Sequence, residues 1–143
     1  MDQLERNKQV VRRAWAAYDA GDEAGFTACV TGDWREHDAG GAVATVADVR
    51  DSMRMHRVAF PDKRTIIDRI VAEGDFVVTH SRSQATHTGE YFGLAPTGKR
   101  LTLEEMLICR IAGGRIAESW QITTGGFMHQ LTGGKAGTGD NQA

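Results

Sequence analysis

The sequence has few cysteines, few prolines and no long apolar run. It contains two cysteines and two prolines among 143 residues. Cys29 and Cys109 lack CxxC spacing and a matching pair of histidines, so we expect buried thiols rather than a disulfide or a metal site. No apolar stretch reaches the roughly 20 residues that a membrane-spanning helix needs. The N-terminal segment is charged where a signal peptide would be apolar, which predicts a cytoplasmic protein.

The sequence also lacks an excess of charge of one sign and the common catalytic motifs. Its 17 Lys and Arg residues nearly balance 19 Asp and Glu residues, for a net charge of -2. Nucleic-acid binding requires clustered basic residues in excess, so no nucleic-acid partner is expected. There is no phosphate-loop spacing of glycines and no GxSxG nucleophile motif. The histidines do not form an HExxH pattern, and no metal ion is predicted.

The first 60 residues carry mainly a helical pattern. Apolar residues at helical spacing predict a helix over residues 3–20, which Gly21 ends, followed by a short helix over 23–30. Thr45 is placed to cap a third helix over 46–59. The intervening segment predicts a short strand at about 34–38 and then a glycine-rich loop.

The segment after Pro61 reads as long strands separated by glycine turns. Strands are predicted over residues 65–72, 76–87, 100–111 and 115–124. Helices followed by an antiparallel run of strands indicate the α+β class, with a curved sheet packed on the N-terminal helices. Such a sheet encloses a pocket.

Alternation along residues 100–111 places a carboxylate on the apolar face of its strand. Glu105 shares a face with leucines at 101, 103 and 107, so we expect it to point into the cavity. Burial there would raise its pKa toward the range useful for acid–base catalysis. If the register were shifted by one residue, Glu104 would face inward instead.

Several motifs together resemble the SnoaL-like polyketide cyclases of the nuclear-transport-factor-2-like superfold. They are HRVAFPDKRTIIDRIVAEGDFVV from His56, ATHTGEYFGLAPTG, RIAGGRIAESW, and HQL at 129–131. The resemblance implies a cone-shaped α+β barrel with a mixed, mostly antiparallel sheet around an apolar cavity. We expect one SnoaL-like domain over residues 1–132, a flexible polar tail over 133–143, and a homodimer that pairs through its sheets.

The resemblance also implies a reaction. The best-known members belong to antibiotic pathways and close a ring of an aromatic polyketide by an intramolecular aldol step, without metal or organic cofactor. An acid–base carboxylate in the last strand works there with polar partners on the neighbouring strand. Here Gln121 stands where that Asp is expected, Leu107 where a His is expected, and Thr124 where many relatives carry an Asp. A glutamine cannot take a proton from carbon, so cyclase, hydroxylase and non-catalytic small-molecule-binding module remain open alternatives.

Candidate site residues follow from strand alternation and from the family resemblance. The predicted catalytic residues are Glu105, Gln121 and His37, the last matching a His often found in this family after the second helix. The predicted substrate-binding residues are His56, His80, Arg82, Tyr91, Phe92, Leu107, Trp120 and Thr124. Trp120 and Gln121 alternate, so only one of them can line the cavity of a regular strand. The leading hypothesis is a cofactor-independent enzyme whose polar groups stabilise the enolate of an aromatic polyketide.

Overall fold

The computed structural model describes residues 1–133 of the chain. Its helices are α1 (Gln3–Ala20), α2 (Glu23–Cys29), α3 (Val46–Ala59) and the short α4 (Phe127–Leu131). Its strands are β1 (Val30–His37), β2 (Val43–Ala44), β3 (Arg64–Glu73), β4 (Phe76–Thr86), β5 (Arg100–Ala112) and β6 (Arg115–Thr123). None of the helices within residues 1–133 is both long and apolar enough to cross a membrane.

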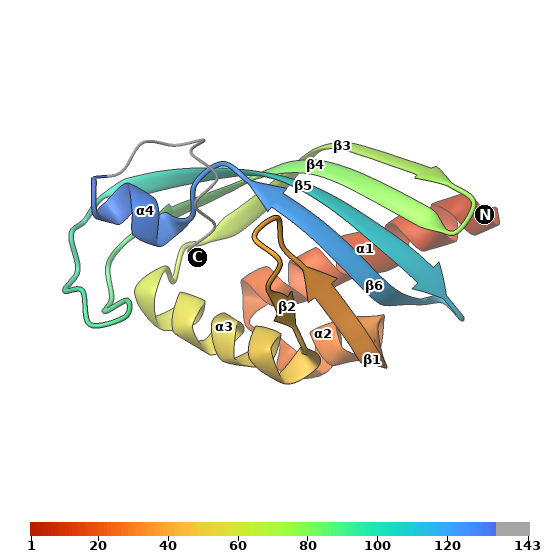
Figure 1. The fold of residues 1–143 in the computed structure, drawn as a ribbon, viewed down its shortest axis with the longest axis horizontal. Helices are drawn as coiled ribbons and strands as arrows, with labels where there is room; N and C mark the ends of the chain where they lie inside the picture. Colours follow the sequence, from red (N-terminus) through yellow and green to blue (C-terminus); the bar gives the residue numbers. More distant parts are fainter. Residues whose placement is uncertain (134–143) are drawn as a thin grey trace.

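The strands form one six-stranded sheet in the order β2-β1-β6-β5-β4-β3. Strand β1 runs parallel to β6, and every other neighbouring pair is antiparallel. The sheet arches over α1, α2 and α3, which lie on its concave side (Figure 1). The predicted α+β fold with a curved, mostly antiparallel sheet on N-terminal helices is therefore confirmed, and the sheet stays open between its edge strands β2 and β3.

Side-chain caps fix where the helices begin and end. The Asp2 carboxylate accepts a backbone N–H in the first turn of α1, and Gly21 ends the helix with φ 69°, a conformation that costs glycine little. Asp22 at once caps α2 in the same way. Thr45 and Asp48 form a reciprocal capping box at the start of α3. These caps fix the first turns of the three helices that lie against one face of the sheet.

The inner face of β5 is the one that leucine spacing predicts. Leu101, Glu105, Leu107 and Cys109 are buried, whereas Met106 and Ile108 on the other face are exposed. The alternative register, with Glu104 facing inward, is wrong. Position 105 therefore places a carboxylate among apolar neighbours.

Two apolar clusters hold the helices on the sheet. The larger one joins α1 and α2 to the sheet through residues such as Val11, Phe26 and Trp34. The smaller one lies around Phe60 and Tyr91 and includes residues of α4. Space remains between the two clusters, and the candidate site occupies it.

Two segments differ from the sequence-based expectation. Strand β1 begins at Val30 rather than near residue 34, and β2 forms where a loop was expected. Local propensity is weak in both, and pairing with β6 and with β1 supplies their backbone hydrogen bonds. The tail predicted over 133–143 lies, apart from Gly133, outside the described residues.

Candidate functional site

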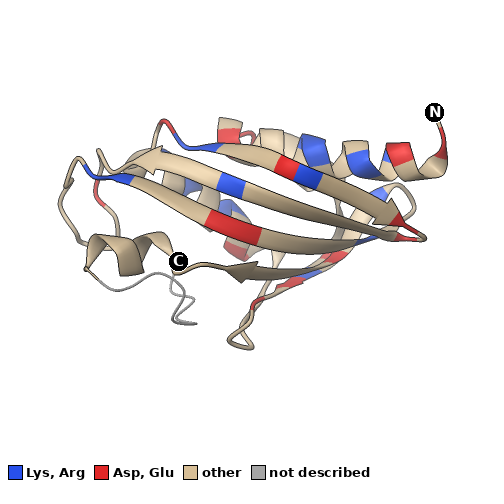
Figure 2. Cartoon of the chain, turned by 90° about the horizontal axis from the view of Figure 1, so that it is seen from above, with Lys and Arg blue, Asp and Glu red and all other residues tan. Residues whose placement is uncertain are grey.

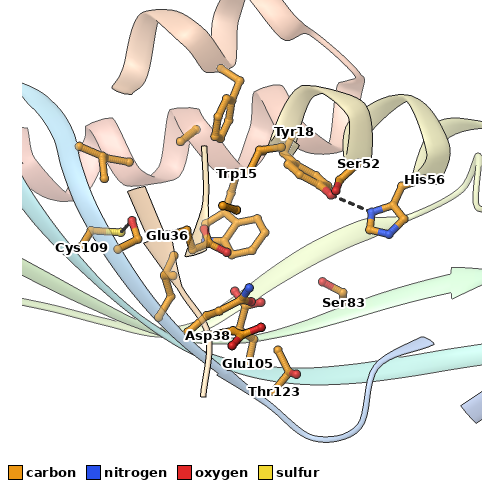
Figure 3. Close-up of a pocket in the computed structure, with 18 of the residues that line it drawn as sticks. Trp15, Tyr18, Glu36, Asp38, Ser52, His56, Ser83, Glu105, Cys109 and Thr123 are labelled. Atoms are coloured by element: carbon orange, nitrogen blue, oxygen red, sulfur yellow. Dashed lines mark hydrogen bonds between the residues drawn. The ribbon is translucent and has the colours of Figure 1, made fainter. Parts of the chain in front are cut away.

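A cavity of about 230 Å³ lies between the helices and the inner face of the sheet (Figure 3). Its aromatic walls come from the four helices and from β1, and comprise Trp15, Tyr18, Phe26, Trp34, His56 and Phe127. Its charged and amide groups are Glu36, Asp38, Lys63, Glu105 and Gln121. The volume is just below the roughly 300–1,000 Å³ of typical small-molecule pockets, and the mixture of apolar walls with few polar groups is typical of them.

Glu105 of β5 is the most deeply buried acid of the cavity. It is 8% exposed, and its Oε1 has no hydrogen-bond partner among the described residues. Burial raises its pKa to about 8, the negative charge of Glu36 adds to the shift, and Lys63 opposes it. At neutral pH this carboxyl is therefore mainly protonated and able to donate a hydrogen bond.

Glu36 of β1 is a second acid that points into the cavity. Its side chain shares the inward face with Trp34, whose indole N–H donates to the hydroxyl of Ser119 at 3.1 Å. Burial raises the pKa of Glu36 to about 7, with a smaller contribution from Asp38. Asp38 itself caps a turn, because its Oδ1 accepts the backbone N–H of Ala42 at 2.9 Å. Glu36 is therefore close to half-ionised at neutral pH.

Tyr18 and His56 form a hydrogen-bonded pair on the helical side of the cavity. The Tyr18 hydroxyl and His56 Nδ1 are 2.7 Å apart (Figure 3). Burial, with a contribution from Lys63, lowers the pKa of His56 to about 4. The imidazole is thus neutral near pH 7, and burial keeps the phenol protonated by raising its pKa. The neutral tautomer of His56 sets the direction of this hydrogen bond: the phenol donates when the ring N–H is on Nε2, and it accepts when the ring N–H is on Nδ1.

Gln121 and Leu107 face each other across β6 and β5 and both line the cavity. Their placement matches the prediction for these two positions. Thr124 does not line it: its hydroxyl accepts the backbone N–H of Glu104 at 3.2 Å, and Thr123 lines the cavity in its place. The prediction for Thr124 is wrong because the residue lies past the last inward position of β6.

The structure places His37 and Trp120 on the outer face of the sheet. His37 Nε2 lies 2.7 Å from Glu118 Oε2, and its ring stacks on Trp120 with 5.5 Å between centroids. The expectation that either residue lines the cavity is therefore wrong. The physical reason is strand alternation, since Glu36 and Gln121 take the inward positions next to them.

His80 and Arg82 also lie on the outer face, contrary to prediction. Arg82 makes two hydrogen bonds of 2.8 Å to Asp68, and His80 Nε2 lies 3.2 Å from Glu104. Charged residues form a band across the middle of neighbouring strands in Figure 2. The middle inward positions of β4 are held instead by small hydroxyl side chains, which are Thr79, Ser81 and Ser83.

Tyr91 and Phe92 do not line the cavity. Tyr91 is buried in the smaller apolar cluster, with its ring 5.9 Å from that of His56, so it supports a cavity residue from behind. Phe92 is exposed, with φ 49°. Of the predicted site residues, the structure brings four together around the cavity: Glu105, Gln121, His56 and Leu107.

The sequence family can be assigned from this fold and this cavity. The sequence model described as SnoaL-like polyketide cyclase matches residues 8–130. The chain belongs to the SnoaL-like family. None of the proteins with curated descriptions matches it significantly.

Solved structures of other proteins share the SnoaL-like fold. AclR from Streptomyces galilaeus, a proposed hydroxylase, is 26% identical with a TM-score of 0.77, over 85% of this chain and 80% of its own. IdmH from Streptomyces antibioticus, a proposed polyketide cyclase, is 24% identical with a TM-score of 0.73, over 82% and 91%. TsrD from Streptomyces laurentii is 22% identical with a TM-score of 0.77, over 93% and 98%.

Three charged groups of this SnoaL-like cavity, Glu36, Asp38 and Lys63, were not predicted. Glu36 follows Trp34 by two residues, so a buried Trp34 would have placed Glu36 inward by alternation, and this signal was available in the sequence. Lys63 lies in the connection between α3 and β3, where no periodicity applies. Within residues 1–133, no group of three or more His, Cys, Asp or Glu side chains is arranged to hold a metal ion.

Proposed function

We propose that this SnoaL-like protein is a cofactor-independent enzyme that forms and stabilises an enolate. Its substrate would be an aromatic, polyketide-derived compound with a β-dicarbonyl or hydroquinone ring. The observation that carries the proposal is Glu105: a buried carboxyl with an unpartnered oxygen, inside an aromatic-walled cavity. A buried polar atom without a partner costs stability, which favours a role with a ligand over a role in the core.

The cavity groups suit an anion that is already delocalised. A carbon between two carbonyls is acidic, so the protein needs mainly hydrogen-bond donors at the developing oxyanion. The protonated carboxyl of Glu105 and the amide of Gln121 provide donors, and Lys63 adds a positive charge. A protonated carboxyl that serves as an oxyanion donor is known from ketosteroid isomerase. The small volume favours entry of the reacting ring alone, packed against the aromatic walls.

Ring closure would follow without a redox step. The enolate carbon attacks a carbonyl carbon of the same molecule, a C–C bond forms, and the new alkoxide takes up a proton. Proximity inside the cavity would favour this intramolecular attack over reaction with water. His37 and Arg82, which were expected to take part, have no role in this scheme because they lie on the outer face.

Hydroxylation is the second candidate, favoured by the similarity to AclR at 26% identity. A hydroquinone ring would then react with molecular oxygen instead of attacking a carbonyl: one oxygen atom forms the new C–O bond, the other leaves as water, and the ring itself supplies the electrons by becoming a hydroxyquinone. Gln121, which replaces the expected acid of the cyclases, is compatible with either outcome because both require only a stabilised carbanion.

Incubation of the purified protein with an aromatic polyketide methyl ester, under air and under argon, tests the proposal. Ring closure should proceed in both atmospheres, whereas hydroxylation should stop under argon. Glu105→Ala should lower either rate at least 100-fold, and Glu104→Ala on the outer face should leave it unchanged. Unchanged turnover in Glu105→Ala would remove the role assigned to this carboxyl. Binding of the ester without turnover would indicate a binding module.

We also propose that the outer face of the sheet forms a homodimer. Large apolar side chains are exposed there on neighbouring strands, including Val71, Met106, Ile108 and Ile122. The band of charges through Arg82–Asp68 and His80–Glu104 borders them. Exposed apolar side chains with a polar border are typical of protein–protein contacts.

A further inference from the structure

Two carboxyl groups from distant parts of the sequence share the cavity without a cation of their own. Glu36 lies on β1 and Glu105 on β5, with β6 between the two strands. Both point into the same space (Figure 3). Neither forms an ion pair among the described residues, and Oε1 of Glu105 has no hydrogen bond there either.

The lysine that lines the cavity is already paired with another carboxylate. Lys63 lines the cavity, but its ammonium lies 2.7 Å from Asp19 Oδ1. Asp38, the third acid, is held by the turn that its carboxylate caps. The two glutamates are therefore free to exchange protons with a ligand.

We propose that Glu36 is the base that removes the proton from the substrate carbon, while Glu105 is the neutral acid that donates a hydrogen bond to the resulting enolate oxygen. This division of roles rests on the enolate chemistry proposed above. It adds Glu36 as a catalytic residue and assigns each carboxyl one protonation state.

Burial determines which group takes which role. Glu105 is the more deeply buried of the two, so it keeps its proton to higher pH. Glu36 ionises first, with a pKa of about 7, and its charge then holds the proton on Glu105. Two carboxyls whose surroundings separate their pKa values commonly divide acid and base work in this way.

The other titratable groups around the pair leave this assignment in place. His56 on α3, Tyr18 on α1 and Cys109 on β5 are all uncharged near pH 7, because burial shifts each pKa away from ionisation. The carboxylate of Asp38 raises the pKa of Glu36, whereas the ammonium of Lys63 lowers that of Glu105, so the two groups act on different members of the pair.

One proton moves from the substrate to Glu36 and back during the reaction. The C–H bond of the substrate breaks, an O–H bond forms on Glu36, and the electron pair moves onto the carbonyl oxygen that Glu105 faces. After the C–C bond forms, Glu36 returns its proton to the new alkoxide. Neither carboxyl is changed at the end of the cycle.

Carbon-13 NMR of protein labelled at the glutamate side-chain carboxyl carbon tests the pairing without a substrate. In the wild type, two glutamates should titrate with midpoints above pH 6. Glu36→Gln should lower the midpoint of Glu105, whereas Glu105→Gln should leave that of Glu36 nearly unchanged, because Glu105 is neutral when Glu36 ionises. Glu104→Gln is the matched control. No midpoint above pH 6 in the wild type, or an unshifted Glu105 in Glu36→Gln, would overturn the proposal.

Exchange of the acidic proton of ethyl 2-naphthoylacetate in D2O tests the roles. Glu36→Gln should slow protein-catalysed exchange at least 100-fold, the usual contribution of a general base. Glu105→Gln, whose amide still donates a hydrogen bond, should lose less than 10-fold, and Glu105→Leu should lose more. Equal losses in Glu36→Gln and Glu105→Gln, or none in Glu36→Gln, would contradict the division. If the wild type shows the coupled titration but no exchange, the enolate chemistry fails while the pairing stands.

Discussion

The ammonium of Lys63 lies 2.7 Å from Oδ1 of Asp19 and so ties the end of α1 to the segment before β3. The same carboxylate accepts the backbone N–H of Thr65 at 2.6 Å and its hydroxyl at 3.0 Å. The Lys63 side chain is only 8% exposed and that of Asp19 is 18% exposed, so the pair is largely shielded from solvent. The contact fixes one wall of the cavity, because Lys63 also lies over the ring of Tyr18.

We predict that Asp19→Ala lowers the free energy of unfolding by about 3–5 kcal/mol, since it leaves a buried ammonium without its partner. Urea unfolding followed by circular dichroism measures the change. Asp51→Ala is the control, because Asp51 pairs with the exposed Arg54 and should cost less than about 1 kcal/mol. Equal losses of unfolding free energy in the two variants would show that the Asp19–Lys63 pair stabilises the fold no more than the exposed pair does.

Stability should fall as pH rises through the neutral range. The pKa of Glu105 is about 8 in the folded protein against a reference value of 4.5. Between these values the folded chain holds a proton that the unfolded chain releases, so the contribution is fully present below pH 4.5 and is lost as pH approaches 8. Glu36 acts in the same direction.

Glu105→Gln should remove its own part of this slope, up to about 1.4 kcal/mol per pH unit, and leave the part due to Glu36. Urea midpoints at pH 5.5 and pH 8 provide the measurement. The variant should gain stability relative to wild type mainly at the higher pH. Parallel pH profiles for variant and wild type would mean that Glu105 is ionised in the folded protein.

A close backbone approach should make Gly89 intolerant of substitution. A Cβ at this position would lie 1.9 Å from the carbonyl oxygen of Val58, and the backbone there cannot easily move because Gly89 N–H donates to Ala59. Gly89→Ala should therefore cost several kcal/mol, at the upper end of single substitutions. Gly32→Ala meets nothing within 4 Å and should lower the melting temperature little. A melting temperature of Gly89→Ala within a degree of wild type would refute the crowding.

The proposed dimer predicts a charge-sensitive outer face. Ile122 is 63% exposed on the sheet, so Ile122→Lys would place charges against each other in a sheet-to-sheet pair and should give monomers in sedimentation experiments. Val58→Lys changes a residue of similar exposure, 64%, on α3 and should leave the dimer intact. If both variants sediment with the same molecular mass as the wild type, the subunits do not pair through this face.

The sequence was most informative where one periodicity extends over many residues. The helix over 3–20 and the inward face of Glu105 follow from apolar spacing, the helix over 46–59 follows mainly from its Thr45 cap, and the structure places all three as expected. Strand β1 was harder, because charged residues and a glycine interrupt its apolar pattern and its partner β6 lies about 80 residues away. His37 was predicted on resemblance and Glu36 was missed, although burial of Trp34 favours an inward Glu36.

The outer-face residues show a second limit of sequence reasoning. Alternation groups His80 with Arg82 on one face of β4, but it does not say which face is turned inward when both carry polar groups. The inward set proved to be hydroxyl side chains, and burial of those small groups depends on packing against α1. Only the three-dimensional arrangement could settle that choice.

The irregular pairing of β1 with β6 decides which chemical group this cavity contains. The register between these parallel strands shifts between Val30 and Arg35, and after that shift Glu36 faces inward and His37 outward. Moving the end of β1 by a single residue would exchange an acid for an imidazole and would also turn Trp34 and Asp38 outward, while the walls from the other elements would stay in place. A one-residue change in strand alternation thus separates a carboxylic acid site from an imidazole site on the same fold.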